Sequence, residues 1–282
     1  MKSILSFSIL SILCIQILSG AICAAQDNFF SKWEDRVRTT SAKQPGWVVP
    51  VITPSSGIVQ LFRTDFVHQY TAARTLTMNF DNSKGFDLIP FNNVEVDVDL
   101  PPYIQHNNTK ATDGAGDFSA ALKYRLITGN EQHGNYSVAA QLLATGAMGS
   151  YKNGVASTTF TPTVVGGKGF GKFDVQSSIG ALMPTHAVNT IGRTIVWNTV
   201  AQYKAGKFLW PELEMNSSYY HLGPNNAKTQ TFLTPGLMVS KLKFRKDSKD
   251  RLAWVFGAGM QVATSHYHAF NHSLVFTSRL SF

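Results

Sequence analysis

The chain has 282 residues, of which 15% are charged, 12% are aromatic and 44% are hydrophobic, and its formal net charge is +8. Soluble domains usually carry about 25% charged residues, and a helical membrane protein needs runs of about 18 apolar residues. No such run follows residue 25, so both classes are disfavoured. The basic residues are scattered rather than interleaved with aromatics, which argues against nucleic-acid binding and favours a modest preference for anionic solutes.

Residues 1–25 predict a secretory signal peptide. Lys2 supplies a positive start, Ile4 to Leu18 is an apolar stretch, and a mostly small-residue cleavage region follows. Both cysteines, Cys14 and Cys23, fall inside this leader, so the exported chain would hold no disulfide. A large sheet whose strands satisfy all their backbone polar groups could stabilise such a chain. We therefore expect an exported protein of the bacterial outer membrane.

Strict two-residue alternation is the main structural signal. Residues 93–100 place valines and a leucine on one face and the carboxylates Glu95, Asp97 and Asp99 on the other, as a strand does. The expected strands are 57–70, 73–80, 93–100, 117–127, 136–146, 157–169, 172–183, 193–205, 208–220, 230–243, 251–264 and 272–282. Most are long enough to cross a bilayer at a tilt, which takes about 9–11 residues. Twelve is an even number, as single-chain bacterial barrels require, although ten or fourteen strands also fit the pattern.

The connections suit an up-and-down barrel with short periplasmic turns and long outer loops. Residues 170–172 and 205–207 form tight turns, whereas polar loops are expected at 101–116, 147–156, 184–192 and 223–228. Two connections have the wrong length for this scheme, because 70–73 is short and 81–92 is long. Pro162, Pro211 and Pro235 also lie inside expected strands, where each removes a ladder donor. Bulges or strand ends must accommodate them.

We predict an all-β fold, a closed antiparallel transmembrane β-barrel over residues 57–282. A periplasmic segment over residues 26–56 would precede it and plug or cap the pore. Charged residues on the wet face of the strands would line a narrow or gated pathway and set its selectivity for a solute that the sequence does not identify. The predicted pore-lining residues are Glu95, Asp97, Asp99, Lys123, Arg125, Lys172, Glu212, Glu214 and Arg279.

The final segment, 272–282, is an amphipathic strand that ends in phenylalanine. Its apolar face includes Phe276, Leu280 and Phe282, with Thr277 and Arg279 on the other face. A closing strand of this kind resembles the signal that outer-membrane barrels present to their assembly machinery. We therefore expect three partners: that machinery, outer-membrane lipid and lipopolysaccharide.

Three groups of residues resemble the outer-membrane barrels of the MetA-pathway of phenol degradation family. They are Gly46–Pro50 with Thr53-Pro54, Gly114–Phe118 leading to Leu122–Leu126, and Phe232–Gly236. The likeness extends over most of the chain after the leader. It implies a barrel of the transporter or porin kind, and the phenolic substrate in the family's label is not carried over to this chain.

No catalytic signature accompanies the strands. The chain has no Gly-x-Ser-x-Gly, His-Glu-x-x-His or Walker A motif, and no cysteine outside the leader. His266, His268 and His272 could approach a metal, but polar loop residues explain them better in the absence of a nearby carboxylate. We predict no enzymatic activity, cofactor or metal. Two alternatives remain: a secreted soluble β-sandwich that binds a ligand, and an outer-membrane hydrolase using Ser278 or Ser217 with His272.

Overall fold

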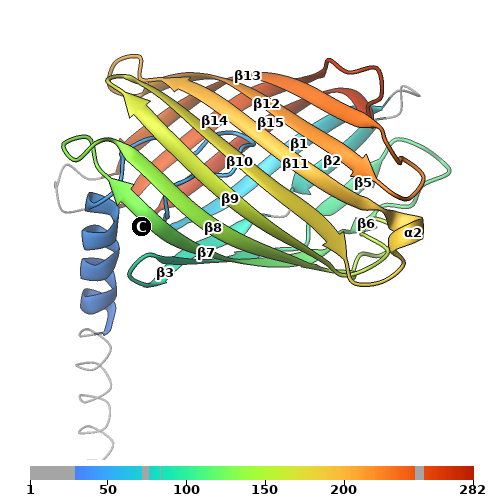
Figure 1. The fold of residues 1–282 in the computed structure, drawn as a ribbon, viewed down its shortest axis with the longest axis horizontal. Coiled ribbons are helices and arrows are strands. Elements are labelled where there is room, and N and C mark those ends of the chain that lie inside the picture. Colours follow the sequence, from blue (N-terminus) through green and yellow to red (C-terminus); the bar gives the residue numbers. More distant parts are fainter. Residues whose placement is uncertain (1–28, 72–75, 83, 245–250) are drawn as a thin grey trace, which may run out of the picture.

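The chain forms a closed β-barrel, seen from the side in Figure 1. The computed structural model describes residues 29–71, 76–82, 84–244 and 251–282. One antiparallel sheet closes on itself because the first strand pairs with the last, from Leu61 opposite Ser281 to Thr71 opposite Phe270. Among the described residues, no helix combines the length and apolar character needed to cross a membrane. The predicted signal peptide lies outside the described residues.

In the described part of the chain, fifteen strand segments occupy twelve positions around the barrel, which confirms the predicted fold class and strand number. In chain order they are β1 Leu61–Thr71, β2 Leu76–Asp81 continued by β3 Gly85–Phe91, β4 Val94–Asp99 continued by β5 Tyr103–His106, β6 Gly114–Ala115 continued by β7 Phe118–Gly129, β8 Tyr136–Gly146, β9 Thr159–Phe170, β10 Phe173–Pro184, β11 Arg193–Tyr203, β12 Leu209–His221, β13 Thr229–Lys243, β14 Ala253–Ala263 and β15 Phe270–Ser281. A short helix, α2 Val188–Ile191, lies between β10 and β11.

The second, third and fourth barrel positions correct two sequence predictions. Residues 81–92 were expected as a long connection, but β3 fills most of this range and continues β2 along the same neighbour, β1. Likewise, β5 and β6 lie within the loop expected at 101–116 and pair with each other. The pattern missed β3 because apolar Ile89 is buried on the inner face and the register shifts around Pro90, between Leu88 and Phe91. With β3 in place, the connection at 92–93 becomes a tight turn and the strands alternate regularly in direction.

The barrel has two distinct ends. The terminal end carries the start of β1 and the end of β15, whereas the loop end carries α2 and most of the long connections (Figure 1).

Two of the strand prolines coincide with local gaps in pairing. The β9–β10 ladder skips the residues around Pro162, and the β13–β14 ladder skips those around Pro235. A missing N–H explains both gaps, and the strands continue past them.

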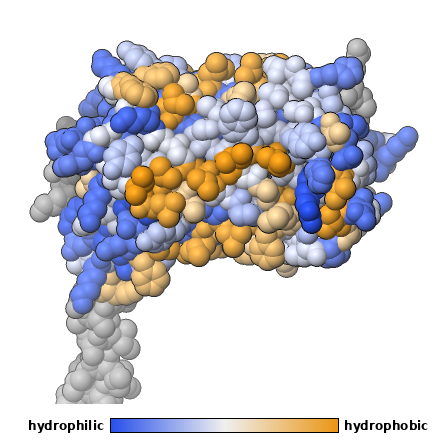
Figure 2. All heavy atoms as spheres, in the orientation of Figure 1, coloured by the Kyte–Doolittle hydropathy of each residue, from blue (hydrophilic) through white to orange (hydrophobic). Residues whose placement is uncertain are grey.

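The outer wall of the barrel is apolar. Leu122, Ile179 and Leu213 are 55%, 58% and 51% exposed, while polar residues between them on the same strands are buried inside. Figure 2 shows hydrophobic residues across the middle of the visible face and hydrophilic residues gathered at both ends. A soluble sandwich would bury these side chains against a second sheet. The single closed sheet therefore rules out the sandwich alternative, and the wall has the distribution of a lipid-facing surface.

A helix over residues 29–42 lies at the terminal end and leads into a non-helical stretch. We call residues 44–60 the inner segment. The helix packs Val37 against Ile58 of the inner segment and Ile89 of β3, with Trp33 at the edge of this cluster. The first described residues of this helix, Phe29 and Phe30, are exposed. The helix is attached to the barrel rim through this small apolar cluster and through hydrogen bonds, such as that from Asn130 to the carbonyl of Ala42.

Candidate functional site

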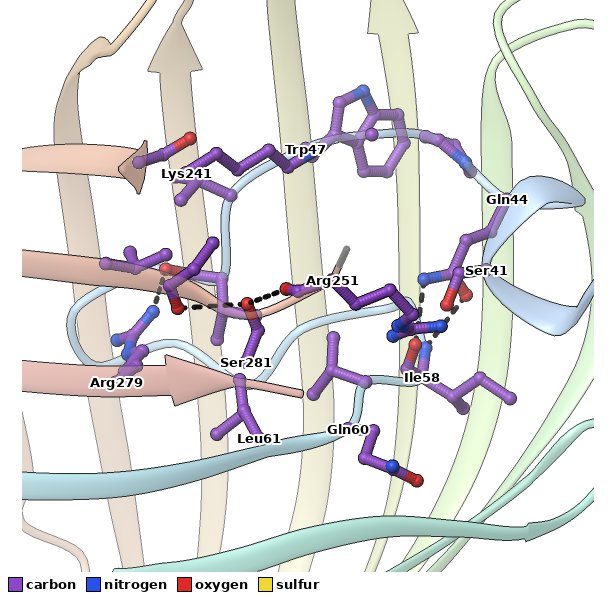
Figure 3. A pocket seen from close by; sticks show the side chains of 18 of the residues that line it. Ser41, Gln44, Trp47, Ile58, Gln60, Leu61, Lys241, Arg251, Arg279 and Ser281 are labelled. Atoms are coloured by element: carbon purple, nitrogen blue, oxygen red, sulfur yellow. Dashed lines mark hydrogen bonds between the residues drawn. The ribbon is translucent and has the colours of Figure 1, made fainter. Parts of the chain in front are cut away.

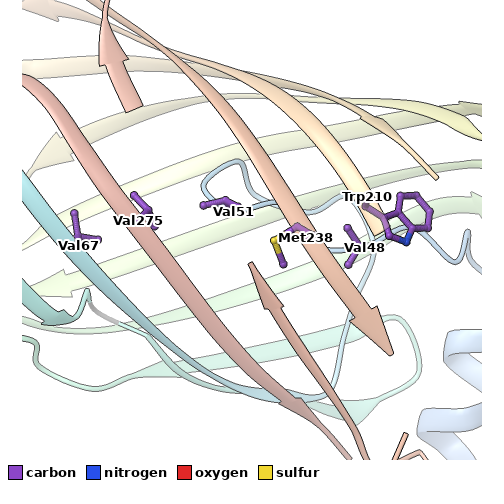
Figure 4. Close-up of a cluster of buried hydrophobic side chains, with 6 residues drawn as sticks. All are labelled: Val48, Val51, Val67, Trp210, Met238 and Val275. Atoms are coloured by element: carbon purple, nitrogen blue, oxygen red, sulfur yellow. The ribbon is translucent and has the colours of Figure 1, made fainter. Parts of the chain in front are cut away.

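The inner segment passes through the interior of the barrel. Its residues make hydrogen bonds to side chains from β1, β4, β7, β8, β10, β12 and β15, which together surround the lumen. Figure 4 shows Val48 and Val51 of this segment against buried wall residues, including Trp210 and Met238. Apolar packing and polar contacts therefore hold the segment on several sides at once.

Two carboxylates of β12 bind the backbone of the inner segment. The amide N–H of Val51 donates to Oε1 of Glu212 at 2.9 Å, and that of Ile52 donates to Oε1 of Glu214 at 2.8 Å. Thr53 donates its amide to the other oxygen of Glu214. Glu214 is fully buried. Because an irregular segment has no strand partner for its amides, these carboxylates satisfy donors that would otherwise be buried unpaired.

Two arginines of the wall bind the carbonyl groups of the same segment. Arg279 of β15 is 1% exposed and donates to the carbonyls of Val49 and Pro50. Arg63 of β1 donates to the carbonyl of Val51 and forms an ion pair with Asp65 at 2.7 Å. Amides thus face carboxylates and carbonyls face guanidinium groups within a few residues of chain. This complementarity indicates that the wall forms a specific binding site for the inner segment. We call the wall side chains that bind it the seat.

A second group of contacts holds the end of the inner segment nearest β1. Lys123 of β7 forms an ion pair with Glu95 of β4 and donates to the carbonyl of Gly57. The amide of Val59 donates to the second oxygen of Glu95. Arg125, which lies on β7 like Lys123, donates to Oε1 of Gln44 at 2.8 Å and to the carbonyl of residue 40 at 2.9 Å. The charged residues of β4 and β7 therefore also face the inner segment.

Six of the predicted pore-lining residues meet at this seat: Glu95, Lys123, Arg125, Glu212, Glu214 and Arg279. Asp97 is buried on the same face, and Asp99 accepts a hydrogen bond from Ser119 at 2.9 Å. Lys172 requires a correction. It lies in the exposed turn between β9 and β10, where the barrel wall has ended, so it does not face the interior. That any of these residues contacts a passing solute stays a prediction.

The sequence reasoning missed several residues of the seat. Gln176 of β10 accepts a hydrogen bond from the amide of Ser56 at 3.0 Å, and Ser137 of β8 donates to the carbonyl of Ser56 at 2.8 Å. Arg63 and Asp65 were also not singled out. All four lie at alternating positions of expected strands, where the period-two pattern places them on the wet face. Only the fold reveals that they bind the inner segment.

A cavity of about 460 Å³ opens at the terminal end, between the inner segment and β13, β14 and β15. In Figure 3, Lys241 and Trp47 lie along one side of it and Leu61 and Gln60 along the other, with Arg251 between them. Its walls are largely apolar, and the charged residues among its described lining are all basic. The cavity is separate from the carboxylates of β12.

The alternatives based on histidine find no geometric support. Within the described ranges there is no group of three or more His, Cys, Asp or Glu side chains that could hold a metal ion. His272 stacks on Tyr70 with ring centroids 4.5 Å apart, and Ser278 accepts a hydrogen bond from Trp254. His272 and Ser278 lie on the same strand, and a rise of about 3.3 Å per residue separates their Cα atoms by roughly 20 Å. Ser217 hydrogen-bonds Thr231 instead.

Comparisons with known proteins agree with the fold. The COG4313 outer membrane channel from Pseudomonas putida F1 superposes with a TM-score of 0.56 at 13% identity, over 84% of this chain and 100% of that chain. The translocator domain of the autotransporter NalP from Neisseria meningitidis gives a TM-score of 0.44 at 12% identity, over 94% and 99%. No family model matches the chain, and no curated protein matches it in sequence. At 13% identity, the likeness to the COG4313 channel establishes the shared barrel fold alone.

Proposed function

We propose that this chain is an outer-membrane pore that is closed by its own N-terminal segment and passes small solutes when that segment withdraws. The observation that carries the proposal is the seat of the inner segment, in which Glu214 and Arg279 bind backbone groups inside a closed barrel. A barrel interior filled only for stability would be expected to hold wall side chains. Here a separate stretch of chain fills it, and such a stretch can leave without breaking the sheet.

The proposal has further parts, which the sequence pattern supports. The terminal end faces the periplasm, and the apolar wall contacts outer-membrane lipid, with lipopolysaccharide at the loop end. The leader over residues 1–25 directs export, and the β15 residues Phe276, Leu280 and Phe282 are recognised by the assembly machinery. Membership of the MetA-pathway of phenol degradation family is part of this proposal, as is the absence of catalytic activity. The charged wall residues set solute preference once the segment has withdrawn.

A cross-link across the seat tests the proposal. Ser137 of β8 contacts the backbone of Ser56. The mature chain is expected to contain no cysteine of its own, so introduced cysteines would be the only thiols. The variant carrying Ser56→Cys and Ser137→Cys, joined by oxidation or a short bifunctional thiol reagent, fixes the segment inside the barrel. We expect no channel openings in planar bilayers in the cross-linked state and restored openings after the link is removed.

Two comparisons make the result decisive. The single variants Ser56→Cys and Ser137→Cys receive the same treatment and should conduct in both conditions. Deletion of residues 26–56 should give a larger and steadier conductance than the full mature chain. Equal conductance of linked and unlinked protein, or no conductance after deletion of the segment from a folded barrel, would contradict the proposal.

A further inference from the structure

The cavity at the terminal end has the size and composition of a ligand site. Small-molecule pockets usually enclose about 300–1,000 Å³, with mostly apolar walls and a few placed polar groups. This cavity measures about 460 Å³ and is lined by Trp47, Val48, Ile58, Leu61 and Val255 together with basic residues. Three of these five apolar side chains come from the inner segment and two from the barrel wall. The cavity therefore exists only while the inner segment is in place.

The basic residues of the cavity differ in how far the protein itself engages them. Arg279 is committed to the carbonyls of the inner segment. By contrast, the Nε of Arg251 is buried without a hydrogen-bond partner, and burial lowers the pKa of its guanidinium from the ordinary value, with Arg38 adding to this effect and Glu34 opposing it. A buried N–H donor without a partner costs free energy unless an acceptor joins it. The Nε of Arg251 therefore leaves one donor at the cavity that the described residues do not satisfy.

Lys241 reaches the cavity through an irregularity in β13. The β13–β14 register shifts between Val239 and Leu242, which is a β-bulge, and Lys241 adopts a positive φ of 58° there. Such a conformation is uncommon for a residue with a side chain, and bulges often redirect side chains near functional sites. As a result, the consecutive residues Ser240 and Lys241 both line the cavity. The Lys241 ammonium makes no hydrogen bond or ion pair within the described ranges, and Glu131 is the nearby acid.

We propose that this cavity binds a small organic anion with an apolar body, such as a hydrophobic carboxylate, that enters from the periplasmic end. Its carboxylate would lie between Lys241 and Arg251, and its apolar part against Trp47 and Ile58. Because both the inner segment and the wall form the site, bound anion stabilises the inserted segment by mass action. This effect on opening rests on the proposed pore function, whereas the binding itself does not.

Binding can be measured without reference to conductance. The purified mature chain is titrated with 2-naphthoate, followed by calorimetry and by tryptophan fluorescence, since Trp47 lines the cavity. The neutral 2-naphthamide and the short anion acetate serve as ligand controls. We expect saturable binding of naphthoate and at least tenfold weaker binding of both controls. Equal binding of the amide would overturn the proposed anion site without requiring any variant.

A matched pair of variants locates the site. Lys241→Met with Arg251→Met removes two cavity cations, while Lys172→Met with Lys207→Met removes two cations from exposed turns at the same end. The first pair should weaken naphthoate binding at least tenfold and the second should leave it unchanged. An equal loss of naphthoate binding in the two double variants would overturn the assignment of the anion to this cavity. Occupation of the cavity by phosphatidylglycerol in nanodiscs would also overturn it. Failure of naphthoate to reduce channel opening, with binding intact, would instead contradict the pore proposal.

Discussion

Substitution of Glu214 should weaken the binding of the inner segment to the barrel wall at one point. The carboxylate accepts two backbone N–H groups, from Ile52 and Thr53, and its residue is fully buried. The variant Glu214→Gln keeps the shape but replaces one acceptor oxygen by an NH₂ group, so one of the two donors loses its partner. An unsatisfied buried donor costs about 1–3 kcal/mol. That cost falls on the inserted state, because water satisfies the same amides once the segment has withdrawn.

The expected consequence is a measurable shift in gating. About 1–3 kcal/mol corresponds to a change of roughly 5- to 150-fold in an equilibrium between two states. The open probability of single channels in planar bilayers should rise by a factor in this range, up to saturation, with unit conductance unchanged. Asp99→Asn is the matched control, because Asp99 bonds Ser119 of the wall and not the inner segment. An unchanged open probability in Glu214→Gln, with the barrel folded, would refute the assigned role of this seat.

Three further predictions concern the wall. Lys123→Met leaves Glu95 buried without its ion-pair partner. It should lower the free energy of unfolding by about 3–5 kcal/mol, as measured by urea titration in vesicles. The additional substitution Glu95→Gln should recover part of this loss. Ile179→Lys places a charge on the exposed apolar wall and should cost about 2–4 kcal/mol near the midplane in the same assay, whereas no change would mean that Ile179 does not face lipid. Deletion of Phe282 should reduce the heat-modifiable barrel in outer-membrane fractions without altering refolding in vitro.

The wall of the barrel could be predicted from local pattern because a strand's side chains alternate regardless of what covers them. Val94–Asp99 and Phe118–Gly129 are strands where the alternation placed them, and their wet faces point inward. The even number of long strands also led to the correct fold class. The pattern failed where alternation is broken, as in β3 around Pro90, and at strand ends, where Lys172 was assigned to the interior although it lies in a turn.

The arrangement of the barrel interior depends on contacts between distant residues, which no local sequence pattern contains. Residues 44–56 show neither strand nor helix periodicity, so the sequence could suggest a plug or cap but not its position or partners. Residues 57–60 were expected to begin the first strand, but β1 begins at Leu61 and these residues belong to the inner segment. Glu212 meets Val51, and Arg279 meets Pro50, across separations of 161 and 229 residues. The same holds for the cavity beside Lys241, whose side chain is directed by a bulge in the ladder. Alternation is a property of one strand, whereas closure of the sheet decides which distant backbone groups the inward charges reach.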